Sequence, residues 1–375
     1  MKLISVQENL KKGLLIVSHG TGKNINLPIL NNILIKAYQN SIELISTNLE
    51  IGIIHKLRGK VEEEGEFTVD AKIITEYVNL LPSENVEIEE VDGELKIECD
   101  NYKTKIKGES AKEFPLIPSV SADNYYSCGV GDLKKALNGV AFAVSNSENR
   151  IELSGVLFNF ENNKLILVAT DSYRLAEKII EINSNNEFNN QKLIVPARTV
   201  QELLRILSNY NSEDLSFEQK GEVRISVSDN QILFTIESVD LVSRLINGQY
   251  PDYKQIIPDK SKTDIITSKQ NLSRAVKAVA IFSKTGVNDV SLEFKNNKII
   301  ISASSGQSGE SRVDVDAEIS GIDNEVAINY RYLVDGLNNI SSDQVRLKVV
   351  SNNTPCVLTA EAEDDYLYVV MPIRQ

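Results

Sequence analysis

The segment Leu133-Lys134-Lys135-Ala136-Leu137, followed by Val140, carries the pattern that decides the fold. Its apolar residues recur at i, i+4 and i+7, which is the spacing of an amphipathic helix. Two apolar strand-like runs joined by a polar turn come next, Val156–Phe158 and Leu165–Val168. The same helix pattern occurs twice more, at Leu10-Lys11-Lys12-Gly13-Leu14 with Val17 and at Leu272-Ser273-Arg274-Ala275-Val276 with Val279. The chain therefore contains one unit repeated three times.

Each repeat also contains a second helix pattern, introduced by a short strand. In the middle repeat the stripe is Val200, Leu204 and Leu207. The equivalent stripes are Ile74, Val78 and Leu81, and then Leu333, Leu337 and Ile340. Short connections without long crossovers favour antiparallel sheets, so we expect the α+β class. Pro-containing polar stretches at 115–119 and 257–261 divide the chain into predicted domains 1–120, 121–258 and 259–375.

The composition is that of a folded globular protein. Of the 375 residues 42% are hydrophobic and 25% charged, and the formal net charge is −13. Most of such a surface repels phosphate, so a nucleic-acid partner requires cations gathered on one face. No run approaches the roughly 20 apolar residues of a membrane span, and we expect a cytoplasmic protein. Cys99, Cys128 and Cys356 are far apart, which predicts buried reduced thiols.

Cations recur at equivalent positions of the repeats. They lie on the side of each predicted helix opposite the apolar stripe. The first helices carry Lys12, Lys135 and Arg274, and the second helices carry Lys72, Arg198 and Arg331. A solvated helix face explains any single one of them, but six equivalent cations in an acidic chain favour a phosphate-facing surface. The second helices also carry Glu76, Glu202 and Asp335, which predicts loose contact with the phosphate backbone that ignores base sequence.

Catalytic chemistry is not indicated. Ser18–Asn24 lacks the first Gly and the final Ser or Thr of a phosphate loop, so we interpret it as a surface loop that carries Lys23. His19 and His55 are the only histidines, which leaves little material for a triad or a zinc site. An acidic turn is favoured over a metal site at Glu361, Glu363, Asp364 and Asp365. We expect no enzyme activity, no cofactor and no metal.

Four segments resemble the bacterial sliding clamp family, the β subunits of DNA polymerase III. They are Leu27–Leu30 (LPIL), Val168–Ala176 (VATDSYRLA), Asn247–Tyr253 (NGQYPDY) and Tyr368–Arg374 (YVVMPIR). The resemblance covers essentially the whole chain. Ser172 and Tyr173 stand where well-known members carry Gly and His, and Gln255 stands where some carry Arg.

The resemblance implies a ring. Two subunits of three DNA-clamp domains would close head to tail around duplex DNA, with antiparallel sheets outside and helices lining a central channel. The chain would tether the replicative polymerase and give replication its processivity. The cations implied to face the DNA are Lys12, Lys23, Lys72, Lys135, Arg150, Arg198, Arg205, Arg274 and Arg331.

The resemblance also implies two protein-binding surfaces. One is a groove for short peptide motifs of polymerases, the clamp loader and repair proteins. By position it maps to Leu153, Thr170, Tyr173, Arg174, Leu175, Pro251, Ile256, Cys356, Val369, Met371, Pro372 and Ile373. Branched apolar side chains and an adaptable Met suit such a groove, with Thr170 and Arg174 orienting the ligand backbone, although a core-bound terminal strand explains Val369 to Ile373 as well. The other is a homodimer interface of Tyr77 and Leu81 against Ile281 and Phe282, for which core packing of Ile281 and Phe282 is an alternative.

Two further functions remain open from the residues alone. A repeat-built scaffold could keep the peptide groove without encircling DNA, and the acidic residues on the second helices favour it. A metal-dependent hydrolase would require the acidic turn to bind a metal.

Overall fold

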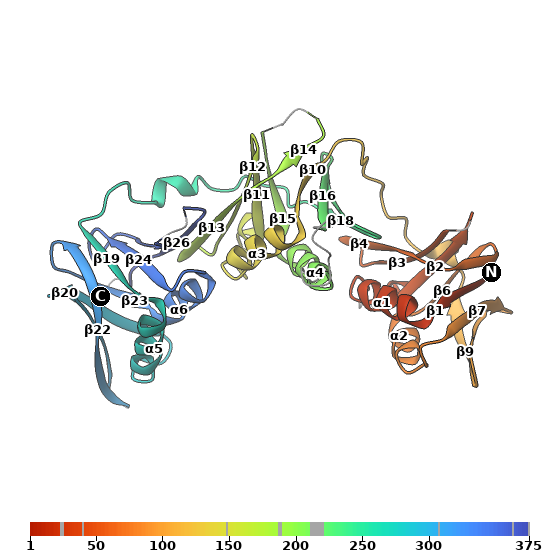
Figure 1. The fold of residues 1–375 in the computed structure, drawn as a ribbon, viewed down its shortest axis with the longest axis horizontal. Helices are drawn as coiled ribbons and strands as arrows, with labels where there is room; N and C mark the ends of the chain where they lie inside the picture. Colours follow the sequence, from red (N-terminus) through yellow and green to blue (C-terminus); the bar gives the residue numbers. More distant parts are fainter. Residues whose placement is uncertain are drawn as a thin grey trace. The chain divides into compact units, whose positions relative to one another are not determined.

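The computed structural model describes residues 1–22, 26–39, 41–147, 149–186, 190–210, 221–306, 308–361 and 364–373. Backbone contacts divide the chain into two compact units (Figure 1). Unit 1 comprises 1–131, 183–187 and 201–245, and unit 2 comprises 132–182, 188–200 and 246–375. The middle repeat contributes to both units, so the compact units do not coincide with the sequence repeats.

Unit 1 is built on one antiparallel sheet. Within the described residues it has 14 strands. In sheet order these are β14 (Asn183–Ser184), β10 (Tyr126–Gly129), β16 (Glu222–Val227), β17 (Gln231–Ile236), β18 (Val239–Arg244), β4 (Ile51–Leu57), β3 (Ser41–Thr47), β2 (Asn32–Tyr38), β6 (Gly65–Asp70), β9 (Tyr102–Glu109), β8 (Glu94–Cys99), β7 (Asn85–Val91), β1 (Lys2–Val6) and β5 (Lys60–Glu63). The β18–β4 pair, with Val239 opposite His55 and Ser243 opposite Ile51, joins the middle repeat to the first.

Unit 2 has the same construction, with 12 strands among the described residues. In order they are β15 (Gln191–Pro196), β11 (Gly155–Glu161), β12 (Lys164–Thr170), β13 (Arg174–Glu181), β26 (Tyr366–Val370), β25 (Cys356–Ala360), β24 (Gln344–Val349), β19 (Thr263–Ser268), β22 (Gly309–Gly321), β21 (Lys298–Ser305), β20 (Asp289–Lys295) and β23 (Asn324–Asn329). The β13–β26 pair joins the middle repeat to the last, with Arg174 opposite Val370.

The helices confirm the sequence pattern. Each repeat has two: α1 (Gln7–Ser18) and α2 (Ala71–Asn79), α3 (Val130–Ala141) and α4 (Ala197–Ser208), and α5 (Lys269–Ala280) and α6 (Tyr330–Asn339). Figure 1 shows α1 beside α2 in unit 1 and α5 beside α6 in unit 2, and both pairs are in contact. All predicted stripe residues are buried except Leu204, which is half-buried. Burial of these stripes against the sheets supplies the main stabilisation.

Short connections behave as their chemistry predicts. Asn162, Asn296 and Asn297 adopt positive φ in the β11–β12 and β20–β21 turns, as Asn tolerates. Asn40, in the turn between β2 and β3 of the first repeat, lies outside the described residues. Single-turn 3₁₀ helices occur at η1 (Pro28–Asn31), η2 (Ala111–Glu113), η3 (Ile151–Leu153) and η4 (Tyr253–Ile256). No helix of the described residues is long and apolar enough to cross a membrane.

Candidate functional site

The loop between β12 and β13 is held by its own polar groups. Asp171 Oδ1 accepts hydrogen bonds from the backbone N–H groups of Tyr173 (2.9 Å) and Arg174 (3.0 Å). The Thr170 hydroxyl accepts from Ser172 N–H (3.1 Å) and donates to the Arg174 carbonyl (2.6 Å). These bonds hold Ser172 at φ +78°, a left-handed conformation that favours glycine. The loop is therefore rigid, and it presents Tyr173, which is 63% exposed.

The last described residues run beside this loop. Met371 N–H donates to the Tyr173 carbonyl (2.8 Å), and Ile373 N–H donates to the Ala327 carbonyl of β23 (2.7 Å). Met371, Pro372 and Ile373 are half-buried, whereas Val369 just before them is fully buried. The chain end is therefore both a core strand, up to Val370, and a surface segment beyond it.

The predicted groove residues divide between two faces of the sheet. Strand register places Arg174, Val370 and Cys356 in one row and Leu175, Val369 and Val357 in the next. Adjacent residues on a strand point to opposite faces. The Leu175 row packs in a core cluster with Tyr253. Arg174 and Cys356 therefore lie on the other face, which separates them from Thr170, Leu175 and Val369.

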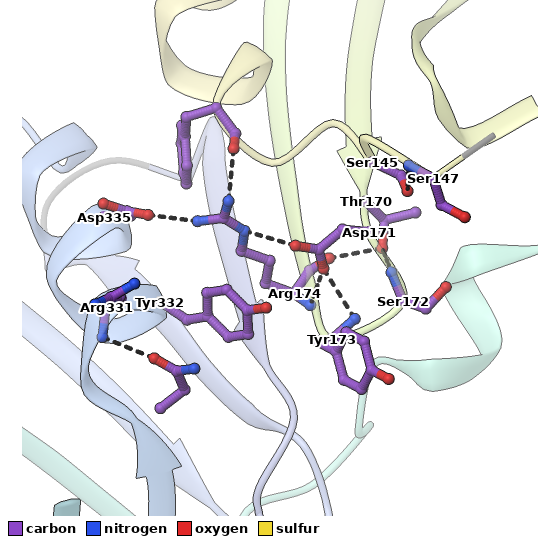
Figure 2. A network of polar contacts seen from close by, with 12 residues as sticks. Ser145, Ser147, Thr170, Asp171, Ser172, Tyr173, Arg174, Arg331, Tyr332 and Asp335 are labelled. Carbon is purple, nitrogen blue, oxygen red and sulfur yellow. Dashed lines mark hydrogen bonds and ion pairs between the residues drawn. The ribbon is translucent and has the colours of Figure 1, made fainter. Parts of the chain in front are cut away.

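Arg174 is the centre of a buried polar network (Figure 2). Its side chain is only 12% exposed. It donates to Asp171 (3.0 Å), to Asp335 of α6 (2.5 Å) and to the Phe142 carbonyl just after α3 (2.8 Å). Its guanidinium lies 4.7 Å from the ring centre of Tyr332. Burial disfavours the charge, but the neighbouring oxygens outweigh it, and the pKa of Arg174 is raised. We therefore assign Arg174 to holding the loop, in place of the expected contact with a ligand backbone.

The segment around η4 completes the site. Tyr253 donates to Glu177 of β13 (2.5 Å), and burial is the main cause of the raised pKa of its hydroxyl. Pro251 lines a concavity of about 520 Å³ over Leu157 and Ile194. Ile256 is exposed, whereas Leu153 is buried in η3. The surface available to a ligand is thus Tyr173, Ile256 and residues 371–373, with Thr170 and Leu175 beneath.

Six of the nine predicted DNA-facing cations are exposed on helices, as expected. These are Lys12, Lys72, Lys135, Arg198, Arg274 and Arg331. Their partners are weak: Lys12 lies 5.0 Å from the ring centre of Tyr210, and Lys72 is 3.9 Å from Glu76. Exposed pairs of this kind leave the cation largely free to meet another anion.

The remaining three predicted cations differ. Arg205 is committed within unit 1, where it donates to the carbonyls of Leu15 (3.2 Å) and Ile16 (2.6 Å) and to Glu202 (2.8 Å). Those carbonyls belong to the last turn of α1, where helical partners are lacking. Arg150 bonds Ser172 (3.0 Å) and Glu152 (3.0 Å), which places it at the groove loop. We therefore remove Arg205 from the DNA-facing set, whereas Arg150, whose side chain is 48% exposed, stays a predicted DNA contact. Lys23 lies outside the described residues.

The predicted dimer residues are only partly accessible. Leu81 is 6% exposed, because it completes the buried stripe of α2, whereas its neighbour Leu80 is 75% exposed. Tyr77 is half-buried, and burial raises the pKa of its hydroxyl. Ile281 is 73% exposed and Phe282 half-buried, so packing in the core does not account for Ile281. Leu80 takes the place of Leu81 as the accessible leucine.

The acidic turn is tied to the sheet. Asp365 pairs with the buried Lys178 of β13 at 2.7 Å. Its backbone carbonyl accepts from Ile179 N–H (2.8 Å). Glu363 lies outside the described residues, and among those described no three His, Cys, Asp or Glu side chains gather as metal ligands. The three cysteines are buried, as predicted, and burial raises the pKa of the Cys356 thiol to about 12.

Sequence reasoning missed Phe142, Tyr332, Asp335 and Glu177 as supports of the site. Phe142, Tyr332 and Asp335 lie far from the motif segments in sequence, so no local spacing connects them, whereas Glu177 directly follows Ala176 and its partner Tyr253 lies far along the chain. Asp335 had one available signal, since it stands at the repeat position of Glu202, which also pairs with an arginine. Leu80 was hidden because the stripe of α2 directs attention to Leu81.

Comparison with known proteins gives one consistent result. Family models of the DNA polymerase III beta subunit match in order: the N-terminal domain at 1–118, the central domain at 130–252 and the C-terminal domain at 254–374. The beta sliding clamp of Synechococcus elongatus is 28% identical over 100% of this chain and 99% of its own length. That of Staphylococcus epidermidis is 27% identical over 93% of this chain and 92% of its own.

Solved structures agree. A putative DNA polymerase III beta subunit from Eubacterium rectale superposes with a TM-score of 0.92 at 29% identity, covering both chains fully. A sliding clamp from Pseudomonas aeruginosa, solved bound to griselimycin, gives 0.92 at 26% identity, again over the whole of both chains. The chain therefore belongs to the DNA polymerase III beta subunit family, the DNA sliding clamps that give replication its processivity.

Proposed function

We propose that two copies of this chain close head to tail around duplex DNA in the cytoplasm and catalyse no reaction. In this proposal the three repeats act as domains 1–120, 121–258 and 259–375. The observation that carries the proposal is an uncovered face of α2. On α4, Leu203 and Ile206 are fully buried in unit 1. Their repeat equivalents on α2 are Tyr77 and Leu80, and Leu80 is exposed. In the proposed ring, a second copy covers this exposed face of α2.

Two unpaired strand edges support the same contact. Among the described residues, 102–107 of β9 pair only with β8, and 309–316 of β22 pair only with β21. The β9 edge carries Lys103, Lys105 and Lys107, whereas the β22 edge carries Glu310, Asp314 and Asp316 and one cation, Arg312, so it is acidic overall. Open edges of opposite charge can pair between copies and are hazardous when left unpaired.

Apolar side chains lie next to both edges. The pKa of Tyr77 responds to Tyr102 at the start of β9, which places the two rings near one another. The Phe282 ring lies 3.9 Å from the position that a Cβ would take on Gly309 at the start of β22. Each edge thus has an apolar neighbour among the predicted contact residues, which suits a stable interface with a polar rim.

The exposed cations of the six helices would face the DNA. They stand at repeat-equivalent positions, so in a closed ring each would recur around the duplex. Phosphate contacts through exposed Lys and Arg carry no sequence information and weaken with salt, which permits sliding. Retention then depends on the closed ring rather than on the strength of any contact.

Retention on circular DNA tests encirclement. After loading, the protein should stay on a nicked circle and leave the same molecule once it is linearised. Equal loss from both forms would contradict encirclement and favour a scaffold that keeps the groove alone.

The groove at Tyr173, Ile256 and Met371 would take the peptide motifs of polymerases, the clamp loader and repair proteins. Its support is an adaptable Met and two exposed side chains, Tyr173 on the rigid β12–β13 loop and Ile256 in η4. Tyr173→Ala together with Met371→Ala should weaken binding of a polymerase-tail peptide at least about tenfold, since each removes apolar contact area. Lys135→Ala is the matched control and should leave peptide affinity unchanged. Unchanged affinity in the double variant would refute the mapping.

A further inference from the structure

An arginine joins neighbouring repeats within unit 1. Arg205 extends from α4, pairs with Glu202 on the same helix and donates to the carbonyls of Leu15 and Ile16 at the end of α1. The guanidinium thus lies between an acidic residue of a second helix and the carbonyl end of the first helix of the preceding repeat. We call this arrangement an arginine brace.

Unit 2 contains a second arginine brace, assembled from the other side. Here the acidic residue is Asp335 on α6 and the carbonyl is that of Phe142, just after α3. Asp335 is the repeat equivalent of Glu202. The guanidinium comes from Arg174, the first residue of β13, instead of from the helix. A brace can therefore draw its arginine from either of two places, the end of the second helix or the start of the strand.

Asn79 and Gly309 are the residues that stand in these two places where copies would meet. The acidic residue is present, because Glu76 on α2 is the equivalent of Glu202. Glu76 is exposed, and its ion partner is Lys72 on its own helix at 3.9 Å. The position of Arg205 in α4 is occupied by Asn79 in α2. The position of Arg174, at the start of β13, is occupied by Gly309 at the start of β22. Neither can donate as a guanidinium does.

We propose that the two joints between copies are the joints of the ring without an arginine brace, and that Asn79 is the residue that keeps them openable. The inference rests on the head-to-tail dimer proposed above. The acceptors for a brace are in place: Glu76 on one copy and, on the other, the carbonyls of Lys277 and Ala278, the equivalents of Leu15 and Ile16 on α5. A joint with acceptors but no donor separates more easily than a braced joint, so ring opening is confined to the joints between copies.

Asn79→Arg tests the proposal by completing the brace. Hydrogen bonds from a charged donor are stronger than neutral ones, so we expect subunit exchange between labelled and unlabelled protein to slow at least about tenfold. Dissociation breaks two such joints, and the dimer Kd should therefore fall about a hundredfold in a dilution series. Asn79→Lys supplies the charge without the planar guanidinium and should slow subunit exchange less.

Two controls separate a brace from added charge. Gln201→Arg adds the same charge at an exposed position of α4 and should leave exchange unchanged. Glu76→Gln in the Asn79→Arg protein removes the acidic partner and should restore most of the original rate of subunit exchange. A dimer whose exchange is unaffected or accelerated by Asn79→Arg would overturn the inference while the dimer stands. A chain that stays monomeric, with or without the substitution, would overturn the inference and the dimer together.

Discussion

Replacing Arg205 with Met tests whether this side chain braces unit 1 or contacts DNA. The substitution keeps an unbranched apolar stem and removes three hydrogen bonds, to Leu15, Ile16 and Glu202. The side chain is 25% exposed, so water replaces part of what is lost. Removing one partner of a buried charged group costs about 3 to 5 kcal/mol, and we take about 3 kcal/mol here because of the partial exposure.

Calorimetry measures that loss. In a cooperative unit of this size about 3 kcal/mol lowers the Tm by about 6 to 12 °C. Lys72→Met is the matched control: its cation is exposed and its ion pair is 3.9 Å long, so we expect a shift below about 1 °C. The salt dependence of DNA binding gives an independent readout. Lys12→Met should reduce the slope of log K against log salt by about 1, whereas Arg205→Met should leave the slope unchanged. A Tm within about 2 °C of the unsubstituted protein, or a reduced salt slope for Arg205→Met, would refute the assignment.

Three further predictions concern His55, Ser172 and Asp335. Burial, and next the charge of Lys12, lower the pKa of His55 to about 4. Because the unfolded chain binds the proton more tightly, the free energy of unfolding should fall as the pH drops from about 6.5 towards 4, by about 2 kcal/mol at pH 5. Thermal unfolding of His55→Gln at pH 7.5 and at pH 5 should show that this loss disappears. Ser172→Gly relieves the strain of a left-handed residue and should raise the free energy of unfolding by about 0.5 to 1 kcal/mol in denaturant unfolding. Asn162→Gly should give a smaller gain, because Asn tolerates that conformation. A lower free energy of unfolding in Ser172→Gly would contradict the strain. Asp335 lies outside the groove, but Asp335→Asn should weaken peptide binding at Tyr173 several-fold, because the substitution loosens Arg174. Unaltered peptide affinity in isothermal titration would show that the loop keeps its conformation without this carboxylate.

The helices and hairpins could be predicted because their signal is local. A stripe at i, i+4 and i+7 needs only one turn of context, and Leu10, Leu133 and Leu272 are all fully buried. The same stripe already placed Leu81 in the core, so periodicity was a better guide to its burial than positional resemblance. Asn in a short polar turn is a local signal of the same kind, and Asn162 and Asn296 adopt the positive φ that Asn tolerates.

The joining of the repeats could not be predicted in this way. The β4–β18 and β13–β26 ladders pair strands that are distant in sequence. The residue pattern of a strand shows which of its faces is buried but does not identify the strand with which it pairs. For the same reason Arg205 and Arg174 were assigned by charge type and by motif. What each cation does depends on acceptors supplied by a different repeat, and only the folded chain reveals them.

The β4–β18 ladder has a consequence for how the protein is made. Ser243 leaves the ribosome about 190 residues after its partner Ile51, which at about 5 to 20 residues per second is a delay of roughly 10 to 40 s. During that interval the nascent N-terminal region carries an open strand edge of apolar sequence, the kind of surface that aggregates or recruits chaperones. Slow translation of the central third would therefore expose newly made protein to loss before it ever meets a second copy.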